Sequence, residues 1–470
     1  MRHMSLEIAP RLLAAIALSA LGCLTQARAQ LAVQNQGYLP YSDAPINYRS
    51  AALSDPVAKL QQRLDQGQAS LQFDSADHGY LRSVLKLLDI PINSQTLVFS
   101  KTSFQYPKIS PDHPRALYFN DDIYIGSVHE GKAIEVVSFD PMQGAIFYLL
   151  DEHKVDRPTF QRGELDCTQC HIAAGTRGIP GVLLRSVYPT AAGTLAPGSR
   201  SYVTDQQSPF SERWGGWYVT GLPAGVPNMG NAVVSDAPSA APGATDQLFT
   251  APKLSPLAST PFDMSAFLAS GSDPVALLVL AHQTQMHNLI TLTNYKTRLA
   301  LYAYSHGTAP ADAASSAPLS LPDGARDRFE HPAEQLLRYL LFADEAPLPG
   351  WAAGQALQAS AFAREFAARG VRDPRGRSLR DFDLNTRIFR YPCSYLIYSD
   401  SFDAIPEPAK GYIYHRLLEI LSGKDLSQDF ATLSAMDRQA ILEILLTTKS
   451  GLPEEWRQYA TFHQLQVAKQ

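Results

Sequence analysis

Two cysteines and a histidine lie together in the segment DCTQCH (166–171). Their spacing, C-x-x-C-H, is typical of sites where a haem is attached covalently to the protein. Two thiols at this spacing lie about one helical turn apart, so both can reach one porphyrin while the adjacent histidine ligates the iron. The motif occurs once. It therefore predicts one haem c bound through Cys167 and Cys170, with His171 as the proximal iron ligand.

Two other chemistries use similar cysteine patterns. A thioredoxin-like redox pair usually follows the first strand of a βαβ unit, whereas this motif lies in mid-chain before a Gly- and Pro-rich stretch. A structural zinc site would need a fourth ligand and usually a second pair of cysteines. Beyond the first 29 residues only Cys393 remains as a further cysteine. The haem interpretation is therefore favoured over both.

The opposite side of a haem iron takes a Met or His ligand, or stays open for chemistry. Four side chains are candidates for this sixth position, and Met229 and His282 lead them. His282, Met286 and His287 lie on one predicted helix. Helical periodicity stacks His282 and Met286 on the buried face and turns His287 away from it. A Met ligand would favour electron transfer, whereas an open site or a displaceable His would suit catalysis.

The string RWGGWYVTG (213–221) contains two of the four tryptophans in the chain. Its paired glycines would let the backbone approach a flat or bulky group. In the haem interpretation, Arg213 pairs with a propionate while Trp214 and Trp217 line the haem and donate hydrogen bonds. The alternative is an aromatic strand within a core, with Arg213 on its rim.

The N-terminus predicts export. Two arginines precede an apolar run (12–24) that is too short to span a membrane, and an Ala-x-Ala sequence ends at Ala29. We expect residues 1–29 to be a signal peptide cleaved after Ala29, which leaves a periplasmic protein. A short anchoring helix is one alternative. Cys23 suggests a lipoprotein as another, although Ala20 stands where such sites favour leucine.

The whole chain has 470 residues and a net charge of −5. This length permits two or three domains with cores of their own. Mild acidity argues against nucleic acid or an anionic membrane surface as a partner. No later stretch approaches the roughly 20 apolar residues of a transmembrane helix. We therefore expect no integral membrane segment in the mature chain, and a periplasmic redox partner.

The elements that must position the motif change character along the chain. A short helix is predicted at Val57–Gln66, and four short strands between 95 and 151 resemble an antiparallel meander. Asp273 as N-cap and Pro274 open a long helix that extends to about Tyr304. The segment 389–399 is either a strand or a buried turn. Further helices are predicted at Pro332–Ala343, Gly354–Arg369, Gly411–Ser422 and Ala435–Thr448.

These elements predict an α+β fold, with an antiparallel strand region before the haem segment and a mainly α-helical region after it. Stretches at 235–262 and 307–325, rich in Ala, Ser and Pro, are predicted as linkers or surface loops. The predicted organisation is a signal peptide at 1–29, a strand-rich region at 30–155, a haem c segment at 156–234, a linker or loop at 235–272, and a helical region at 273–470 that completes the haem pocket.

The haem segment resembles c-type cytochromes in general. More widely, the chain resembles a group of exported single-haem cytochrome c domain proteins of Gram-negative bacteria. The resemblance assigns a function only to Cys167, Cys170 and His171. The haem lies in mid-chain, unlike that of a small cytochrome c. The strings that carry the resemblance are FNDDIYIG (119–126), CTQCH (167–171), SPFSERWGGWYVTG (208–221), MGN (229–231), HQTQMHN (282–288) and YPCSYLIYS (391–399).

Two functions from different classes follow from these observations. The first is an electron-transfer protein with a six-coordinate haem c that exchanges electrons with a periplasmic redox partner. The second is a haem-dependent oxidoreductase acting on peroxide, oxygen or an organic substrate. The second is suggested by size, because an electron shuttle does not need so long a chain. A haem-based sensor is a third reading, but no signalling domain is recognisable.

Overall fold

The computed structural model describes nine ranges of the chain. The predicted signal peptide (1–29), and much of the predicted loops at 235–262 and 307–325, lie outside them. The described residues are 39–75, 78–163, 165–222, 225–235, 252–257, 262–306, 323–349, 357 and 359–467.

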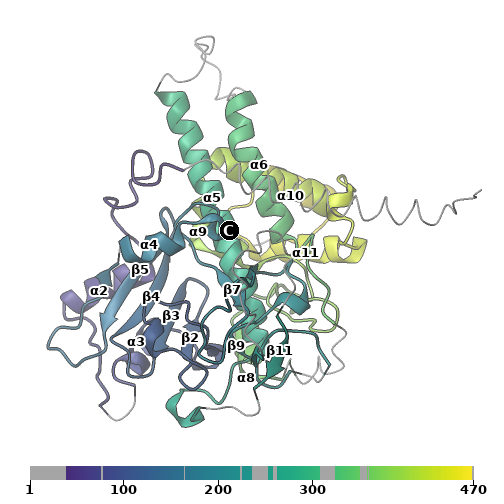
Figure 1. Cartoon of the computed structure of the whole chain (residues 1–470). Helices are drawn as coiled ribbons and strands as arrows, with labels where there is room; N and C mark the ends of the chain where they lie inside the picture. Colours follow the sequence, from purple (N-terminus) through teal and green to yellow (C-terminus); the bar gives the residue numbers. More distant parts are fainter. Residues whose placement is uncertain are drawn as a thin grey trace, which may run out of the picture.

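The predicted α+β class is confirmed: an antiparallel strand region precedes a helical C-terminal region (Figure 1). The main sheet has the order β6-β5-β4-β3-β2-β1-β9, and each neighbouring pair is antiparallel. Six of its strands, β1 to β6, pair in chain order. The first five of them lie in the predicted meander, where four strands were expected, while β9 joins the far edge from beyond the cysteine motif. The strands are β1 (Thr96–Val98), β2 (Arg115–Phe119), β3 (Ile123–Val128), β4 (Ala133–Asp140), β5 (Gly144–Asp151), β6 (Gln161–Arg162) and β9 (Trp217–Tyr218).

Both faces of the main sheet are buried. Successive side chains of a strand point to opposite sides, so the two faces contribute to different cores. Tyr124, Val137 and Phe147 belong to one face, which packs against the long helix α5 (Pro274–Ser305). Ile125 and Val136 belong to the other face, which forms a second core. The second core is covered by α2 (Pro56–Asp65) and α3 (Leu81–Leu87).

Helix α5 begins as the sequence predicts. The carboxylate of Asp273 accepts hydrogen bonds from the amides of Val275 (2.7 Å) and Ala276 (3.1 Å), and Pro274 occupies the first turn. The helix packs against β5, β7 (Leu184–Val187) and α6 (Asp323–Leu340), among other elements, and crosses the middle of the molecule (Figure 1). It therefore contacts both the strand region and the helical region.

The position of His287 differs from the sequence prediction. The prediction turned this side chain away from the buried face, but it is fully buried and stacks on Phe139, with ring centroids 3.9 Å apart. The physical reason is that α5 is covered by the sheet on one side and by helices on the other. Helical periodicity locates a solvent-facing side only when the helix has one.

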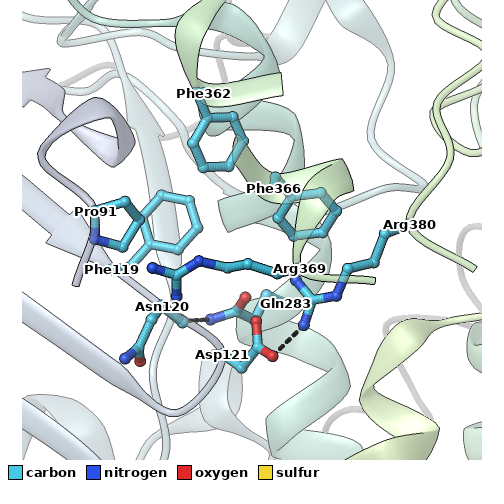
Figure 2. A pocket seen from close by; sticks show the side chains of 9 residues that line it. All are labelled: Pro91, Phe119, Asn120, Asp121, Gln283, Phe362, Phe366, Arg369 and Arg380. Atoms are coloured by element: carbon cyan, nitrogen blue, oxygen red, sulfur yellow. Dashed lines mark hydrogen bonds and ion pairs between the residues drawn. The ribbon is translucent and has the colours of Figure 1, made fainter. Parts of the chain in front are cut away.

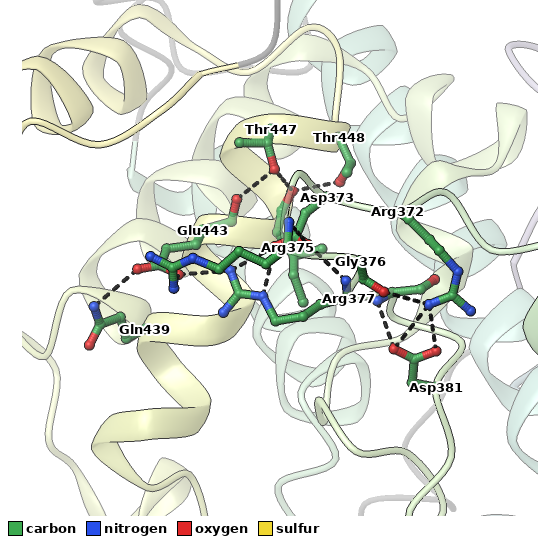
Figure 3. A network of polar contacts seen from close by, with 12 residues as sticks. Arg372, Asp373, Arg375, Gly376, Arg377, Asp381, Gln439, Glu443, Thr447 and Thr448 are labelled. Atoms are coloured by element: carbon green, nitrogen blue, oxygen red, sulfur yellow. Dashed lines mark hydrogen bonds and ion pairs between the residues drawn. The ribbon is translucent and has the colours of Figure 1, made fainter.

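The helical region follows α5 and agrees in outline with the prediction, although residues 354–356 and 358 of the predicted helix Gly354–Arg369 lie outside the described residues. One ion-pair network joins the loop before residue 381 to α11: Glu443 accepts from Arg375 (2.8 Å) and Arg377 (2.7 Å), and Arg377 also bonds to Asp373 (2.7 Å) (Figure 3). The helices are α6 (Asp323–Leu340), α8 (Ala361–Ala368), α9 (Asp400–Asp403), α10 (Glu407–Leu421), α11 (Ala435–Thr448) and α12 (Glu454–Phe462).

Three details refine the sequence-based description. Helix α6 begins before the predicted Pro332 and contains this proline, whose carbonyl oxygen lies 3.4 Å from Thr293 Oγ1 of α5. The segment 389–399 is a buried turn containing a short 3₁₀ helix. The predicted linker 235–272 contains, where it is described, the strand β11 (Leu254–Pro256), which pairs with β10 (Ala232–Val234). A second two-stranded sheet joins β7 (Leu184–Val187) and β8 (Ser201–Thr204).

Candidate functional site

The cysteine motif lies on the short helix α4 (Leu165–His171), which follows the edge strand β6 directly. Cys167 is partly buried and packs against the first core, while Cys170 is exposed. None of the three cysteines that the structure describes is in a disulfide. The helix therefore presents two thiols and one imidazole at one edge of the sheet, with one thiol facing solvent.

The imidazole of His171 is held in one orientation. Its Nδ1 lies 2.8 Å from the carbonyl oxygen of Gly181, and its ring packs on Phe147 with centroids 4.8 Å apart. Since a carbonyl only accepts, Nδ1 carries the hydrogen and Nε2 keeps its lone pair. No residue that the structure describes hydrogen-bonds to Nε2. Burial also lowers the pKa of His171, which keeps the ring neutral at pH 7. The arrangement suits a metal ligand.

The loop that follows the motif is docked on α5. Asn288 Oδ1 accepts from the amide of Val182 (3.1 Å), and Asn288 Nδ2 donates to the carbonyl oxygen of Val182 (2.7 Å). One turn away on the helix, Gln285 Nε2 donates to the carbonyl oxygen of Gly175 (3.2 Å). The two side chains thus hold both ends of the segment 175–182 against a rigid helix.

A charged pair lies on the sheet face beside His171. Arg115 of β2 is paired with Glu135 of β4, and both charges act on the pKa of His171, in opposite directions. Arg115 lies across Gly126 of β3, where a Cβ atom would collide with its guanidinium group. The Nε atom of Arg115 is buried and has no hydrogen-bond partner in the described part of the chain. Arg115 could therefore bind a negatively charged group through the Nε–H that has no partner among the described residues.

The same sheet face is apolar around this pair. The register places Leu117, Gly126 and Glu135 in one row across three strands, and Val137 beside Phe147 in the next row. Leu117 and Val137 are only partly buried, although they pack against the first core. Apolar side chains that stay partly open around a glycine form a surface suited to one face of a flat apolar ligand.

Met229 lies in another part of the molecule. It is buried in a small cluster with Tyr188 and Val234, and Ser186 Oγ lies 3.7 Å from its sulfur. Its backbone amide donates to the carbonyl oxygen of Arg213 (2.9 Å). None of the contacts described for Met229 involves the motif helix.

His282 and Met286 are fully buried on α5. Both ring nitrogens of His282 are engaged: Nδ1 lies 2.5 Å from Gln206 Oε1, and Nε2 lies 2.8 Å from Ser394 Oγ. The ring also stacks against Phe342 with centroids 4.6 Å apart. Burial lowers the pKa of His282 to about 3, so the ring is neutral at pH 7. In this arrangement His282 could bind a metal only after giving up one of its hydrogen bonds.

Arg213, Trp214 and Trp217 hold their own loop together. Arg213 is buried, and its guanidinium group donates to the carbonyl oxygens of Ser208 (2.8 Å) and Gln206 (3.0 Å). Trp217 Nε1 donates to the carbonyl oxygen of Arg185 (2.8 Å) on β7. Trp214 is buried, and its Nε1 has no partner among the described residues. The structure thus joins this string to β7 and to the segment before it, rather than to His171.

Two of the segments quoted for the family resemblance, 119–126 and 391–399, bond to α5. Besides its bonds to the motif loop, α5 uses Gln283 Nε2 to reach the carbonyl oxygen of Asn120 (2.7 Å), and Gln283 Oε1 accepts from Tyr395 (2.5 Å). His287 Nε2 donates to the carbonyl oxygen of Asp121 (2.7 Å). Every residue of HQTQMHN (282–288) is at most 3% exposed. Buried polar side chains of α5 thus bond to three segments that are distant in the chain.

A small cavity lies where the turn at 120–121 meets α5 and α8, next to the ion pair between Asp121 and Arg380 (Figure 2). Its volume is about 10 Å³. This is about the size of one water molecule, so the cavity is too small for a cofactor.

Within the described residues, no group of three or more His, Cys, Asp or Glu side chains gathers in a way that could hold a metal ion. Within the same ranges, none of the helices combines the length and apolarity needed to cross a bilayer. Comparison of the chain with protein-family models, curated proteins and solved structures gives no match.

Proposed function

We propose that the protein is an exported monohaem c-type cytochrome that transfers electrons to a periplasmic redox partner. The observation that supports it best is the hydrogen bond between His171 Nδ1 and Gly181 O, which fixes the tautomer whose Nε2 can bind iron. The motif spacing supports the same conclusion, because the exposed Cys170 and the partly buried Cys167 stand on the same short helix.

The residues around the motif fit a haem. Cys167 and Cys170 would hold it through thioether bonds, His171 would ligate the iron, and the partly open side chains of Leu117 and Val137 would contact the ring. Arg115, with its buried and unpartnered Nε, would pair with a propionate. A bound haem supplies a one-electron redox centre, while the protein sets its position and electrostatics.

Export is part of the proposal. It is supported by the two arginines, the apolar run (12–24) and the Ala-x-Ala sequence ending at Ala29, the pattern of a cleaved signal peptide. A periplasmic location would give the chain access to covalent haem attachment and to a redox partner.

A second candidate function is a haem-dependent oxidoreductase acting on peroxide, oxygen or an organic substrate. The observation in its favour concerns the sixth ligand. Both ring nitrogens of His282 are hydrogen-bonded, and Met229 packs in a separate cluster. An iron that receives no sixth protein ligand is open to small molecules.

The attachment experiment uses the full chain, produced together with a haem c attachment system. We expect haem stain to remain on the protein in a denaturing gel, and to be lost when both Cys167 and Cys170 are changed to Ser. The matched control is Cys393→Ala, which alters a buried cysteine away from the motif and should keep the stain. Absence of stain on the wild-type chain would refute the proposal.

An absorption spectrum separates the two functions. A low-spin iron that ignores carbon monoxide supports electron transfer, and a high-spin iron that binds it supports the oxidoreductase. Met229→Leu and His282→Gln then test the predicted ligands one at a time, because only loss of the true ligand changes the spin state. From the hydrogen bonds of its ring, we expect His282→Gln to leave the spin state unchanged.

A further inference from the structure

Asn288 is tied to the residue next to Gly181. Its side chain accepts from the Val182 amide (3.1 Å) and donates to the Val182 carbonyl oxygen (2.7 Å), so both halves of the carboxamide are used on one residue of the loop. Asn288 is fully buried in the middle of α5. A two-point hydrogen bond to a buried helix fixes the local orientation of the backbone, and with it the direction of the neighbouring peptide groups.

The contact is also close in space. A Cβ atom on Gly181 would lie only 2.2 Å from Asn288 Oδ1, so the loop approaches α5 at a point where no side chain fits. The Gly181 carbonyl is the acceptor for His171 Nδ1. The path from α5 to the imidazole therefore consists of two contacts: Asn288 to the backbone at Gly181–Val182, and Gly181 to His171.

We propose that Asn288 is a positioning residue for His171, and that through the Gly181 carbonyl it tunes the reduction potential of the bound haem. This inference rests on the proposed function. A hydrogen bond from the outer nitrogen of a ligating imidazole raises the basicity of the ligand and favours the ferric state. Weakening that bond lowers the basicity of the imidazole and favours the ferrous state, so the midpoint potential rises.

The experiment compares two asparagines of α5 in haem-loaded full-length protein. Asn288→Leu removes both hydrogen bonds to Val182. Asn294→Leu is the matched control, because Asn294 is 2% exposed on the same helix and bonds to the carbonyl oxygen of Ala404 (3.0 Å) instead. Asn288→Ala is a second variant: it removes the same two hydrogen bonds without adding a charge. Redox titration gives the midpoint potential, and thermal unfolding gives the stability.

We expect Asn288→Leu to raise the ferrous-to-ferric ratio at fixed potential on the order of tenfold, which is about 59 mV for a one-electron couple. Asn288→Ala should shift the ratio in the same direction, because it loses the same two hydrogen bonds. Asn294→Leu should lower stability without moving the potential. Equal potentials for the wild type and both Asn288 variants would overturn the inference, as would an equal shift in Asn294→Leu. If Asn288→Leu does not fold, Asn288→Ala decides alone. A wild-type chain without covalent haem would instead refute the proposed function.

Discussion

Gly181 holds His171 from two sides. Its carbonyl oxygen lies 2.8 Å from His171 Nδ1, and its amide donates to the backbone carbonyl oxygen of His171 (3.0 Å). The ring orientation and the exit of the chain from the motif helix are thus fixed by the same residue. Because Gly181 also lies against Asn288, the position tolerates no side chain.

The first prediction concerns Gly181→Ala. The added methyl group would meet Asn288 Oδ1 and push the loop away from α5, which weakens the hydrogen bond to His171. We expect the fraction of chains carrying haem, measured by the Soret absorbance per protein, to fall on the order of tenfold, as for other losses of support to a metal ligand.

The control for this variant is Gly178→Ala in the same loop. A Cβ at Gly178 meets no atom within 4 Å, and only its φ of +73° is unfavourable for alanine. That strain costs about 1 kcal/mol, and haem loading should stay close to wild type. The prediction is wrong if the two alanine variants load haem equally.

The second prediction separates two arginines. Arg213→Leu would leave the carbonyl oxygens of Ser208 and Gln206 without their buried donor, at about 1–3 kcal/mol for each. We therefore expect a loss of about 3 kcal/mol in the free energy of unfolding, measured with urea, and an unchanged midpoint potential. Arg200→Leu, at an exposed position, should change stability by no more than about 0.5 kcal/mol.

The third prediction concerns Arg115→Leu. If Arg115 pairs with a propionate, its removal should alter the midpoint potential and the amount of bound haem, since a cation close to the haem is lost. Redox titration of Arg115→Leu beside Arg213→Leu provides the measurement. A potential that shifts in Arg213→Leu and not in Arg115→Leu would reverse the assignment and favour the one made from the sequence.

Arg213 and Arg115 show what the sequence could and could not predict. The motif, the meander and the Asp273 cap depend on residues close together in the chain, and the elements appear where they were expected. In the sequence, the neighbouring tryptophans point to Arg213. Arg115 carries no such signal, because its position next to His171 arises from the register of β2 with β3 and from the placement of the motif helix.

Helix α5 was the harder case. Its start was predicted correctly, but its polar residues 282–288 bond to segments distant in the chain, and periodicity contains no information on partners so far away. A signal existed in the two Gln residues and the Asn of HQTQMHN, whose carboxamides would be costly to bury without hydrogen bonds. Only the three-dimensional arrangement shows that Asn288 meets the loop that follows the C-x-x-C-H motif.

The fourth prediction concerns the pH dependence of stability. Burial lowers the pKa of His287 to about 4, whereas an unfolded histidine titrates near 6.5. Between these values the unfolded chain binds a proton that the folded protein does not, so stability falls as the pH drops from about 6.5 to about 4. The slope is about 1.4 kcal/mol per pH unit for one histidine. His282, whose pKa is lowered to about 3, contributes with the same sign.

The test uses His287→Gln and urea unfolding at pH 7, 6 and 5. Glutamine keeps a donor for the Asp121 carbonyl and does not titrate, so the variant should be less stable at pH 7 and lose less stability on acidification. Asp122, whose pKa is raised to about 7 by burial, acts in the opposite direction in both proteins and cancels in the difference. Parallel pH profiles for the two proteins would contradict the prediction.

The last prediction uses the three cysteines as reporters of the site. In protein produced without the attachment system, Cys170 is exposed, Cys167 is partly buried, and Cys393 is fully buried, where burial raises the pKa of its thiol well above the usual range. Iodoacetamide reacts with accessible thiolates, so Cys170 should be labelled first and Cys167 next. Cys393 should react on the order of a hundredfold more slowly, because it must wait for local unfolding. Mass spectrometry of peptides gives the three rates.

After haem attachment, Cys167 and Cys170 should no longer react while the rate at Cys393 stays the same. Labelling of Cys170 in the haem-loaded protein would show that its sulfur takes no part in the attachment.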